Sequence, residues 1–166
     1  MLQGVFTALV TPFSHNGHID IGALNAIVQR QLESGIDGLV PIGTTGESPT
    51  LDDKEKELII KTVAHLAHGK VPVIAGSGSN CTKSAIEATK KAKDAGADYT
   101  LQVAPYYNKP SEEGLYRHFI EIAEKGGLPV VLYNIPGRSA INMSVDLILR
   151  LAEHQVDRHV DRKSTR

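Results

Sequence analysis

The chain has 166 residues, of which 41% are hydrophobic and 22% charged, and its formal net charge at pH 7 is −1. This composition is ordinary for one globular domain with its own core, and the near-neutral charge disfavours nucleic acid and anionic membranes as partners. No apolar run approaches the length of a membrane span. The single cysteine, Cys81, excludes an internal disulfide and predicts a cytoplasmic protein.

Short apolar runs alternate with helical patterns along the chain. The expected strands cover residues 4–10, 38–42, 71–75, 99–104 and 129–134. Between the strands, apolar residues recur at the spacing of one helix face, as at Leu24, Ile27, Val28 and Leu32. This alternation predicts repeated βα units around a parallel sheet.

Two kinds of residue predict where the helices begin and end. Gly35 and Gly96 each precede an expected strand, where the end of a helix favours a left-handed residue. Thr50, with Asp53 three residues later, is predicted to be the N-cap of a helix that begins at residue 51.

The fold pattern is compatible with two architectures. Runs such as Val130-Val131-Leu132 do not alternate with polar residues, which is typical of strands buried on both faces. Five such strands are enough for a doubly wound open sheet, including a complete flavodoxin-like domain. A (β/α)8 barrel needs eight units and about 250 residues. The pattern alone leaves both open.

The end of the chain departs from the repeat. Residues 157–166 contain one aliphatic side chain, Val160, where a sixth buried strand is due. We therefore expect a barrel-like or open-sheet domain over 1–155 and a solvated polar tail over 156–166 that forms no strand. Without a sixth strand, the edges of the first and fifth strands would remain unpaired.

Three segments near the ends of expected strands carry side chains suited to chemistry. They are Gly43-Thr44-Thr45-Gly46-Glu47, Pro105-Tyr106-Tyr107-Asn108-Lys109-Pro110 and Tyr133-Asn134-Ile135-Pro136-Gly137-Arg138. In a barrel these segments would meet at the C-terminal face. Hydroxyls and backbone amides can bind a carboxylate, a phenol can transfer a proton, and a guanidinium suits a carboxylate or phosphate. Each segment also has a purely structural interpretation, as a tight loop, packed aromatic residues or a surface arginine.

Residues 1–155 closely resemble the dihydrodipicolinate synthase family, a group of pyruvate-dependent, Schiff-base-forming aldolases. The resemblance is carried by the three segments above together with Gly4-Val5-Phe6-Thr7-Ala8-Leu9-Val10-Thr11-Pro12-Phe13 and Gly76-Ser77-Gly78-Ser79-Asn80. It implies a (β/α)8 TIM barrel of which about five βα units are present.

The resemblance also implies an activity, the condensation of pyruvate with aspartate semialdehyde on the route to diaminopimelate and lysine. A lysine amine of the family attacks the pyruvate ketone and forms an imine. Tyr133 matches the family's proton donor and acceptor, and Thr44 and Tyr107 match its relay partners. The family takes the Tyr107 equivalent from a neighbouring subunit, which implies a tight dimer, usually paired into a tetramer. Thr45 matches the ligand of the pyruvate carboxylate, and Arg138 matches the ligand of the semialdehyde carboxylate.

Two further comparisons narrow the expected function. Sialic acid lyases, an alternative within the same superfamily, typically lack an arginine at the Arg138 position and often have serine at the Thr44 position. Asn80 and Tyr106 match the family's cleft for a lysine effector, although other positions depart from the feedback-sensitive members.

The imine-forming lysine of the family would fall near position 161, where this chain has Asp161. Lys163 stands among polar residues, without the apolar surroundings that lower a lysine pKa toward about 7–8. We therefore expect that this chain has no Schiff-base lysine and is an inactive fragment. We also expect neither a cofactor nor a bound metal. The alternative is a non-catalytic half-barrel that binds small carboxylates or associates with full-length subunits.

Overall fold

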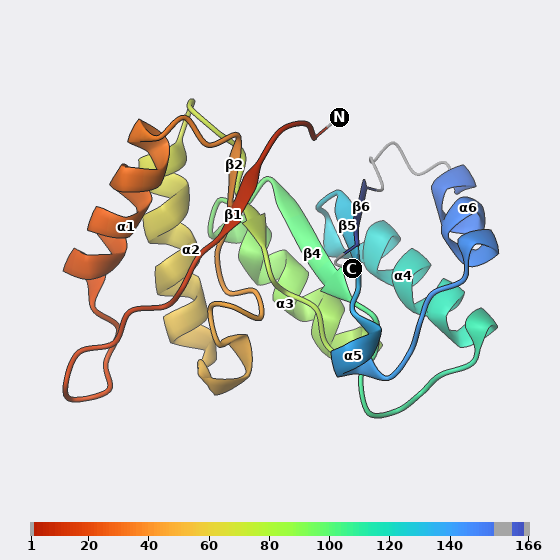
Figure 1. The fold of residues 1–166 in the computed structure, drawn as a ribbon. Helices are drawn as coiled ribbons and strands as arrows, with labels where there is room; N and C mark the ends of the chain where they lie inside the picture. The colour runs from red at the N-terminus through yellow and green to blue at the C-terminus, as the bar shows by residue number, and fades with distance from the viewer. Residues whose placement is uncertain (1, 155–160, 165–166) are drawn as a thin grey trace. The chain divides into compact units, whose positions relative to one another are not determined.

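A computed structural model describes residues 2–154 and 161–164 (Figure 1). The strands are β1 (Phe6–Ala8), β2 (Gly38–Val40), β3 (Ile74–Ala75), β4 (Tyr99–Val103), β5 (Val130–Asn134) and β6 (Asp161–Ser164). The helices are α1 (Ile21–Glu33), α2 (Asp53–Ala67), α3 (Thr82–Asp94), α4 (Glu112–Gly126), α5 (Pro136–Ser139) and α6 (Val145–Glu153), with a 3-10 turn η1 at Ser48–Thr50. A helix follows each of the first five strands, which confirms the predicted βα repeat.

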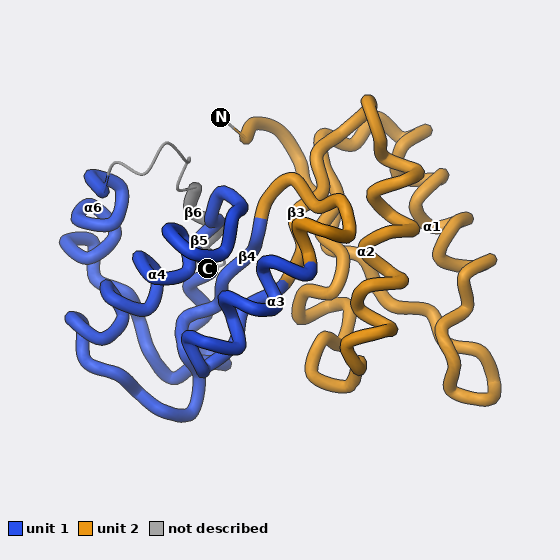
Figure 2. Tube along the Cα trace, turned by 180° about the vertical axis from the view of Figure 1, so that it is seen from behind, with its two compact units in different colours: residues 1, 77–91, 100–166 blue, residues 2–76, 92–99 orange. Residues whose placement is uncertain are grey.

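The chain divides into two compact units (Figure 2). Unit 2 comprises residues 2–76 and 92–99, and the described part of unit 1 comprises residues 77–91, 100–154 and 161–164. Each unit is described separately below.

Unit 2 holds the first three strands with α1 and α2. β1 and β2 pair in parallel, from Phe6↔Gly38 to Ala8↔Val40, and a parallel bridge joins Leu39 to Val73. Leu24 and Val28 of the predicted α1 stripe are fully buried, which confirms that this face packs inward. A Cβ at Gly38 would overlap the ring of Phe6, so only glycine allows this close contact.

The helix ends of unit 2 are partly as predicted. Gly35 and Gly96 both have left-handed backbone, with φ of 74° and 98°. The predicted cap at Thr50 is wrong, because Thr50 lies in η1 and donates its hydroxyl to the Glu47 carbonyl. Asp52 is the N-cap of α2: its carboxylate accepts from the Glu55 amide at 2.8 Å, and the Glu55 carboxylate accepts from the Asp52 amide at 2.9 Å.

Unit 1 holds most of α3 and of β4, together with β5, β6 and α4 to α6, whereas residues 92–94 and Tyr99 belong to unit 2. The β4–β5 pair runs from Thr100↔Val130 to Val103↔Tyr133. Its apolar core draws on α3, α4, β5 and α6, and consists of Ala85, Ala104, Leu115, Phe119, Ile122, Ala123, Val130, Leu132, Met143, Leu147 and Leu151.

A buried polar cluster also lies within unit 1. The Gln102 amide nitrogen lies 2.6, 2.9 and 3.0 Å from the hydroxyls of Thr100, Thr89 and Ser77. Thr89 additionally donates to the Ala85 carbonyl at 2.7 Å. These hydrogen bonds join β4, α3 and the segment after β3 through buried side chains.

The prediction that the polar segment after α6 forms no strand is wrong. Asp161–Ser164 forms β6 and pairs in parallel with β5, from Val131↔Asp161 to Asn134↔Ser164. β5 is therefore paired on both sides, and the expected open edge at the fifth strand is wrong as well. The physical reason is that main-chain amides and carbonyls make the pairing, and every non-proline residue supplies them. The rest of the predicted tail, residues 156–160 and 165–166, lies outside the described residues.

Candidate functional site

The first segment that carries predicted site residues is the loop Gly43–Glu47 of unit 2. The Gly46 amide donates to the Gly43 carbonyl at 3.1 Å, and the Glu47 amide donates to the Thr44 carbonyl at 3.2 Å. Thr44 and Thr45 are both exposed. The loop therefore holds two adjacent hydroxyl side chains on a backbone that is closed by its own hydrogen bonds.

Buried contacts anchor this loop to the rest of unit 2. The Thr11 hydroxyl donates to the Gly46 carbonyl at 2.7 Å. A Cβ at Gly76 would overlap the Ile42 carbonyl oxygen and lie 2.9 Å from the Gly43 Cα. The absence of a side chain at Gly76 lets the loop rest directly on the backbone that follows β3.

The segment Tyr133–Arg138 of unit 1 begins at the end of β5, with Tyr133 inside the strand and Arg138 beyond it. Tyr133 is half-buried, and its carbonyl accepts from the Ala104 amide at 3.1 Å. The β5–β6 register pairs Tyr133 with Lys163, two positions beyond Asp161. This backbone register places a lysine next to the predicted proton-transfer residue.

Arg138 lies on α5, the four-residue helix that follows β5. Its side chain is exposed, and its amide donates to the Ile135 carbonyl at 2.9 Å. Within the described part of the chain the guanidinium has no hydrogen bond or ion pair. The five donors of the guanidinium are thus available to an anionic ligand.

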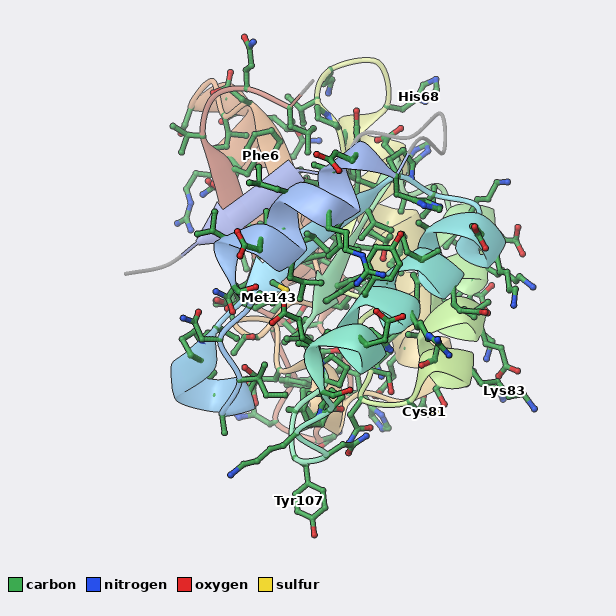
Figure 3. All side chains as sticks on the ribbon, turned by 90° about the vertical axis from the view of Figure 1, so that its right-hand side faces the viewer. Phe6, His68, Cys81, Lys83, Tyr107 and Met143 are labelled. Carbon is green, nitrogen blue, oxygen red and sulfur yellow. The ribbon has the colours of Figure 1, made fainter. Side chains whose placement is uncertain are left out.

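The segment Pro105–Pro110, in the loop between β4 and α4, presents Tyr107 to solvent. The Tyr107 side chain is 90% exposed, and Figure 3 shows it pointing away from the ribbon. Tyr107 and Lys109 have positive φ angles of 70° and 47°, which are uncommon for residues other than glycine. A large exposed ring on such a backbone is an arrangement that needs local support.

Asn108 supplies that support through Asn80. The Asn108 side-chain amide donates to the Asn80 carbonyl at 2.8 Å, and the Asn80 side-chain amide donates to the Asn108 side-chain oxygen at 3.2 Å. The Asn108 backbone amide also donates to the Tyr106 carbonyl at 2.9 Å. These contacts join the loops of the two predicted effector residues, Asn80 and Tyr106.

The predicted site residues are thus distributed over both units. Unit 1 holds Asn80, Tyr106, Tyr107, Tyr133 and Arg138, and unit 2 holds Thr44 and Thr45. The sequence interpretation missed the side chains that anchor the three segments, namely Thr11, Asn108, Asn134 and Ser139. Thr11, Asn108 and Asn134 bond to residues that are 35, 28 and 9 positions away, and the sequence does not display such pairing. Ser139 bonds to the nearby Ile135 and Ile141 carbonyls.

One buried titratable group lies apart from these segments. His118 of α4 is 5% exposed, and its Nδ1 lies 2.9 Å from the Thr82 hydroxyl. Its Nε2 has no partner among the described residues. Burial lowers the pKa of His118 to about 4, so the ring is neutral at pH 7.

Neither a metal site nor a membrane helix is found in the part of the chain that the structure describes. Residues 2–154 and 161–164 contain no group of three or more His, Cys, Asp or Glu side chains that could hold a metal ion. None of the helices in these ranges has the length and apolar character that a membrane crossing requires.

Comparison with known proteins gives consistent matches. The sequence model of the dihydrodipicolinate synthetase family matches residues 1–160. A 4-hydroxy-tetrahydrodipicolinate synthase of Bradyrhizobium diazoefficiens is 53% identical over 151 residues, which are 91% of this chain and 51% of the relative. The chain therefore spans about half the length of the curated relatives it matches.

Solved structures match over nearly the whole chain. A dihydrodipicolinate synthase from Acinetobacter baumannii, complexed with pyruvate, is 45% identical with a TM-score of 0.94, over 98% of this chain and 55% of that one. A second synthase, from Cyanidioschyzon merolae with lysine bound, is 47% identical with a TM-score of 0.88, over 92% of this chain and 52% of that one. These neighbours are (β/α)8 barrels, which confirms the barrel over the open sheet, with about five βα units present.

Proposed function

We propose, because this chain belongs to the dihydrodipicolinate synthetase family, that it is about half of a 4-hydroxy-tetrahydrodipicolinate synthase. The complete enzyme condenses pyruvate with aspartate semialdehyde through a lysine imine, in the cytoplasm. The observation that carries the proposal is the placement of Thr45 and Arg138. Each side chain is exposed, is of a type that can bind a carboxylate, and lies on a tight segment just after a strand.

Thr45 binds the carboxylate of pyruvate in this proposal. The Gly43–Glu47 loop is fixed by its internal hydrogen bonds and by Thr11, so its hydroxyls need little ordering before they meet a ligand. A pyruvate complex of the Acinetobacter relative supports the choice of ligand.

Tyr133 transfers protons during the reaction, with Thr44 and Tyr107 as relay partners. Tyr107 acts from a second copy of the chain in a tight dimer that pairs into a tetramer. Its 90% exposed ring and its left-handed backbone support a role outside its own protomer. Because the ring is exposed, it contributes almost no buried apolar area to the stability of its own chain.

Arg138 binds the carboxylate of the semialdehyde. Its free guanidinium can form two parallel hydrogen bonds with one carboxylate group. The same arginine favours a synthase over a sialic acid lyase. Asn80 and Tyr106 form part of a cleft for lysine, and the lysine complex of the Cyanidioschyzon relative supports that effector.

The chain itself forms no imine in this proposal, because Asp161 occupies the expected lysine position. The register partnership of Lys163 with Tyr133 makes Lys163 the residue to test. Pyruvate is added with borohydride and the mass of the chain is measured, with and without a Lys163→Gln substitution. No pyruvate adduct is expected. An adduct that disappears in Lys163→Gln would show that this chain retains an attacking amine.

Pyruvate binding tests the proposal directly. Chemical-shift titration with pyruvate is expected to perturb the Thr44 and Thr45 amides, and Thr45→Val is expected to weaken the affinity about tenfold, equivalent to 1.4 kcal/mol. Thr50→Val, an exposed threonine of η1, is the matched control and should bind normally. Absence of any perturbation by pyruvate would contradict the proposed function.

The aspartate at position 161 also favours a second candidate, a non-catalytic half-barrel that associates with full-length synthase subunits. Mixing the purified chain with an intact synthase and measuring mass by native mass spectrometry separates the two. A mixed assembly would support the second candidate, and separate species would exclude it.

A further inference from the structure

We infer that Asn134 and Ser139 are positioning residues that fix the turn carrying Arg138, and that they thereby set the affinity for the carboxylate that Arg138 binds. The inference rests on the proposed function, because it takes Arg138 to be the carboxylate ligand. Neither residue touches the ligand in this account.

Asn134 ties together the two ends of the segment that contains Arg138. It is the last residue of β5 and only 5% exposed. Its side-chain oxygen accepts from the Met143 amide at 3.2 Å, and its side-chain amide donates to the Asn142 side-chain oxygen at 2.7 Å. Met143 is itself buried in the core of unit 1, so both ends of the segment are joined to buried parts of that unit.

Ser139 ties down the middle of the same segment. It follows Arg138 directly and is 1% exposed. Its hydroxyl lies 3.0 Å from the carbonyls of both Ile135 and Ile141, and it can accept from the Ile141 amide at 3.4 Å. The hydroxyl thus bridges the residues on either side of α5.

The hydrogen bonds of Asn134 and Ser139 are needed because α5 is too short to be stable as a helix by itself. A four-residue helix is far below the length at which helices are stable in water. The turn after it places Ala140 at a positive φ of 58°, where a side chain is disfavoured. The segment keeps this conformation because two buried polar side chains determine it, and the conformation decides where the Arg138 Cα lies.

The arrangement leaves only the Arg138 side chain to be ordered when a ligand binds. If the segment were mobile, binding would also have to order its backbone. Ordering of loops and side chains lowers affinity by about 0.5–1.5 kcal/mol for each immobilised group, which is up to about tenfold. A purely structural role for Asn134 would instead change overall stability without selecting one ligand.

The test measures two ligands on the same chain by chemical-shift titration. Succinic semialdehyde, a four-carbon aldehyde with one carboxylate, is the probe for Arg138, and pyruvate is the probe for Thr45. Asn134→Ala is expected to weaken succinic semialdehyde binding about tenfold and leave pyruvate binding unchanged. Ser139→Ala should act in the same direction.

Two milder variants keep the test informative if Asn134→Ala does not fold. Asn142→Ala removes an exposed partner and leaves the Asn134–Met143 hydrogen bond intact, so an affinity loss of about threefold is expected. Asn134→Asp keeps the acceptor for the Met143 amide, and the Asn142 amide can turn to donate to the second oxygen. This variant should recover most of the affinity.

The outcomes separate the inference from the proposed function. If Arg138→Ala, as the only substitution, does not weaken succinic semialdehyde binding, the proposed role of Arg138 as the carboxylate ligand is wrong. If Arg138→Ala weakens binding but Asn134→Ala and Asn142→Ala do not, only the positioning inference fails. Equal weakening of both ligands in these variants would also overturn it, because that pattern indicates general destabilisation.

Discussion

The two units differ in what they bury. Among the described residues, unit 2 buries one polar side chain, Thr11, in an otherwise apolar core. The buried polar side chains of unit 1 are Ser77, Thr89, Thr100, Gln102, His118, Asn134 and Ser139. Buried polar groups stabilise a fold only while their partners remain in place. The stability of unit 2 therefore depends mainly on close packing. The stability of unit 1 depends, beside its apolar core, on buried hydrogen bonds and, through His118, on pH.

The largest expected effect concerns close packing in unit 2. Gly76→Ala places a Cβ against the Ile42 carbonyl and the Gly43 Cα, and backbone atoms cannot turn aside as a side chain can. We expect a loss of about 3 kcal/mol in the free energy of unfolding, measured by urea denaturation.

Gly43→Ala is the matched control for that substitution. A Cβ at Gly43 would meet only a Val40 methyl carbon at 3.8 Å, which is ordinary contact. The expected change is within about 0.5 kcal/mol. Equal destabilisation by Gly76→Ala and Gly43→Ala would show that the close approach of the backbone at Gly76 is not the cause of the loss in stability.

The next effect is an acid sensitivity of unit 1. The buried His118 has a pKa lowered to about 4 from its usual 6.5, so below pH 6.5 the unfolded chain binds a proton that the folded chain excludes. Stability should fall as the pH drops from about 6.5 to about 4, by up to about 3 kcal/mol from this group.

His118→Gln should flatten that part of the pH profile, since glutamine does not titrate. His65→Gln, on the exposed side of α2 in unit 2, removes an exposed histidine instead of a buried one and is the matched control. The profile is recorded by urea denaturation at several pH values. An unaltered slope in His118→Gln would refute the assignment.

A third effect compares two threonines that make the same local bond. Thr89 of α3 donates to the Ala85 carbonyl at 2.7 Å, and Thr62 of α2 donates to the Leu58 carbonyl at 2.8 Å. Only Thr89 is also part of the buried cluster around Gln102. Thr89→Val should therefore lower the free energy of unfolding by about 1–2 kcal/mol more than Thr62→Val. Equal losses would mean that the buried cluster adds nothing.

The same contrast explains what the sequence could predict. Buried apolar runs carry a strong signal, so the sequence predicts five strands. Thr44, Tyr133 and Arg138 are candidates because they lie in segments near the ends of those strands. β6 was missed because its pairing with β5 uses the main chain, which has no signature in side-chain composition. The anchor at Thr11 was missed because its partner, Gly46, is 35 residues away.

The roles of the site residues rest on other evidence than the fold does. The match to the family fixes the architecture, while Thr45, Tyr107 and Arg138 are assigned by resemblance and by their exposure on anchored segments. Local geometry explains why these side chains are presented to solvent. Ligand titration is what assigns them a substrate.

The smallest expected effect concerns the start of α2, for which the sequence predicts Thr50 as the N-cap and the structure shows Asp52. Asp52 accepts a hydrogen bond from the Glu55 amide, whereas Thr50 caps no helical amide and only donates to the Glu47 carbonyl. Asp52→Ala should lower the free energy of unfolding by about 1 kcal/mol, and Thr50→Ala by less, because its single exposed bond is readily replaced by water. Both losses should also be smaller than that of Thr89→Val, since water can reach the caps of unit 2 but not the cluster of unit 1. A larger loss at Thr50 than at Asp52, in urea denaturation at pH 7, would restore the cap predicted from the sequence and contradict the observed one.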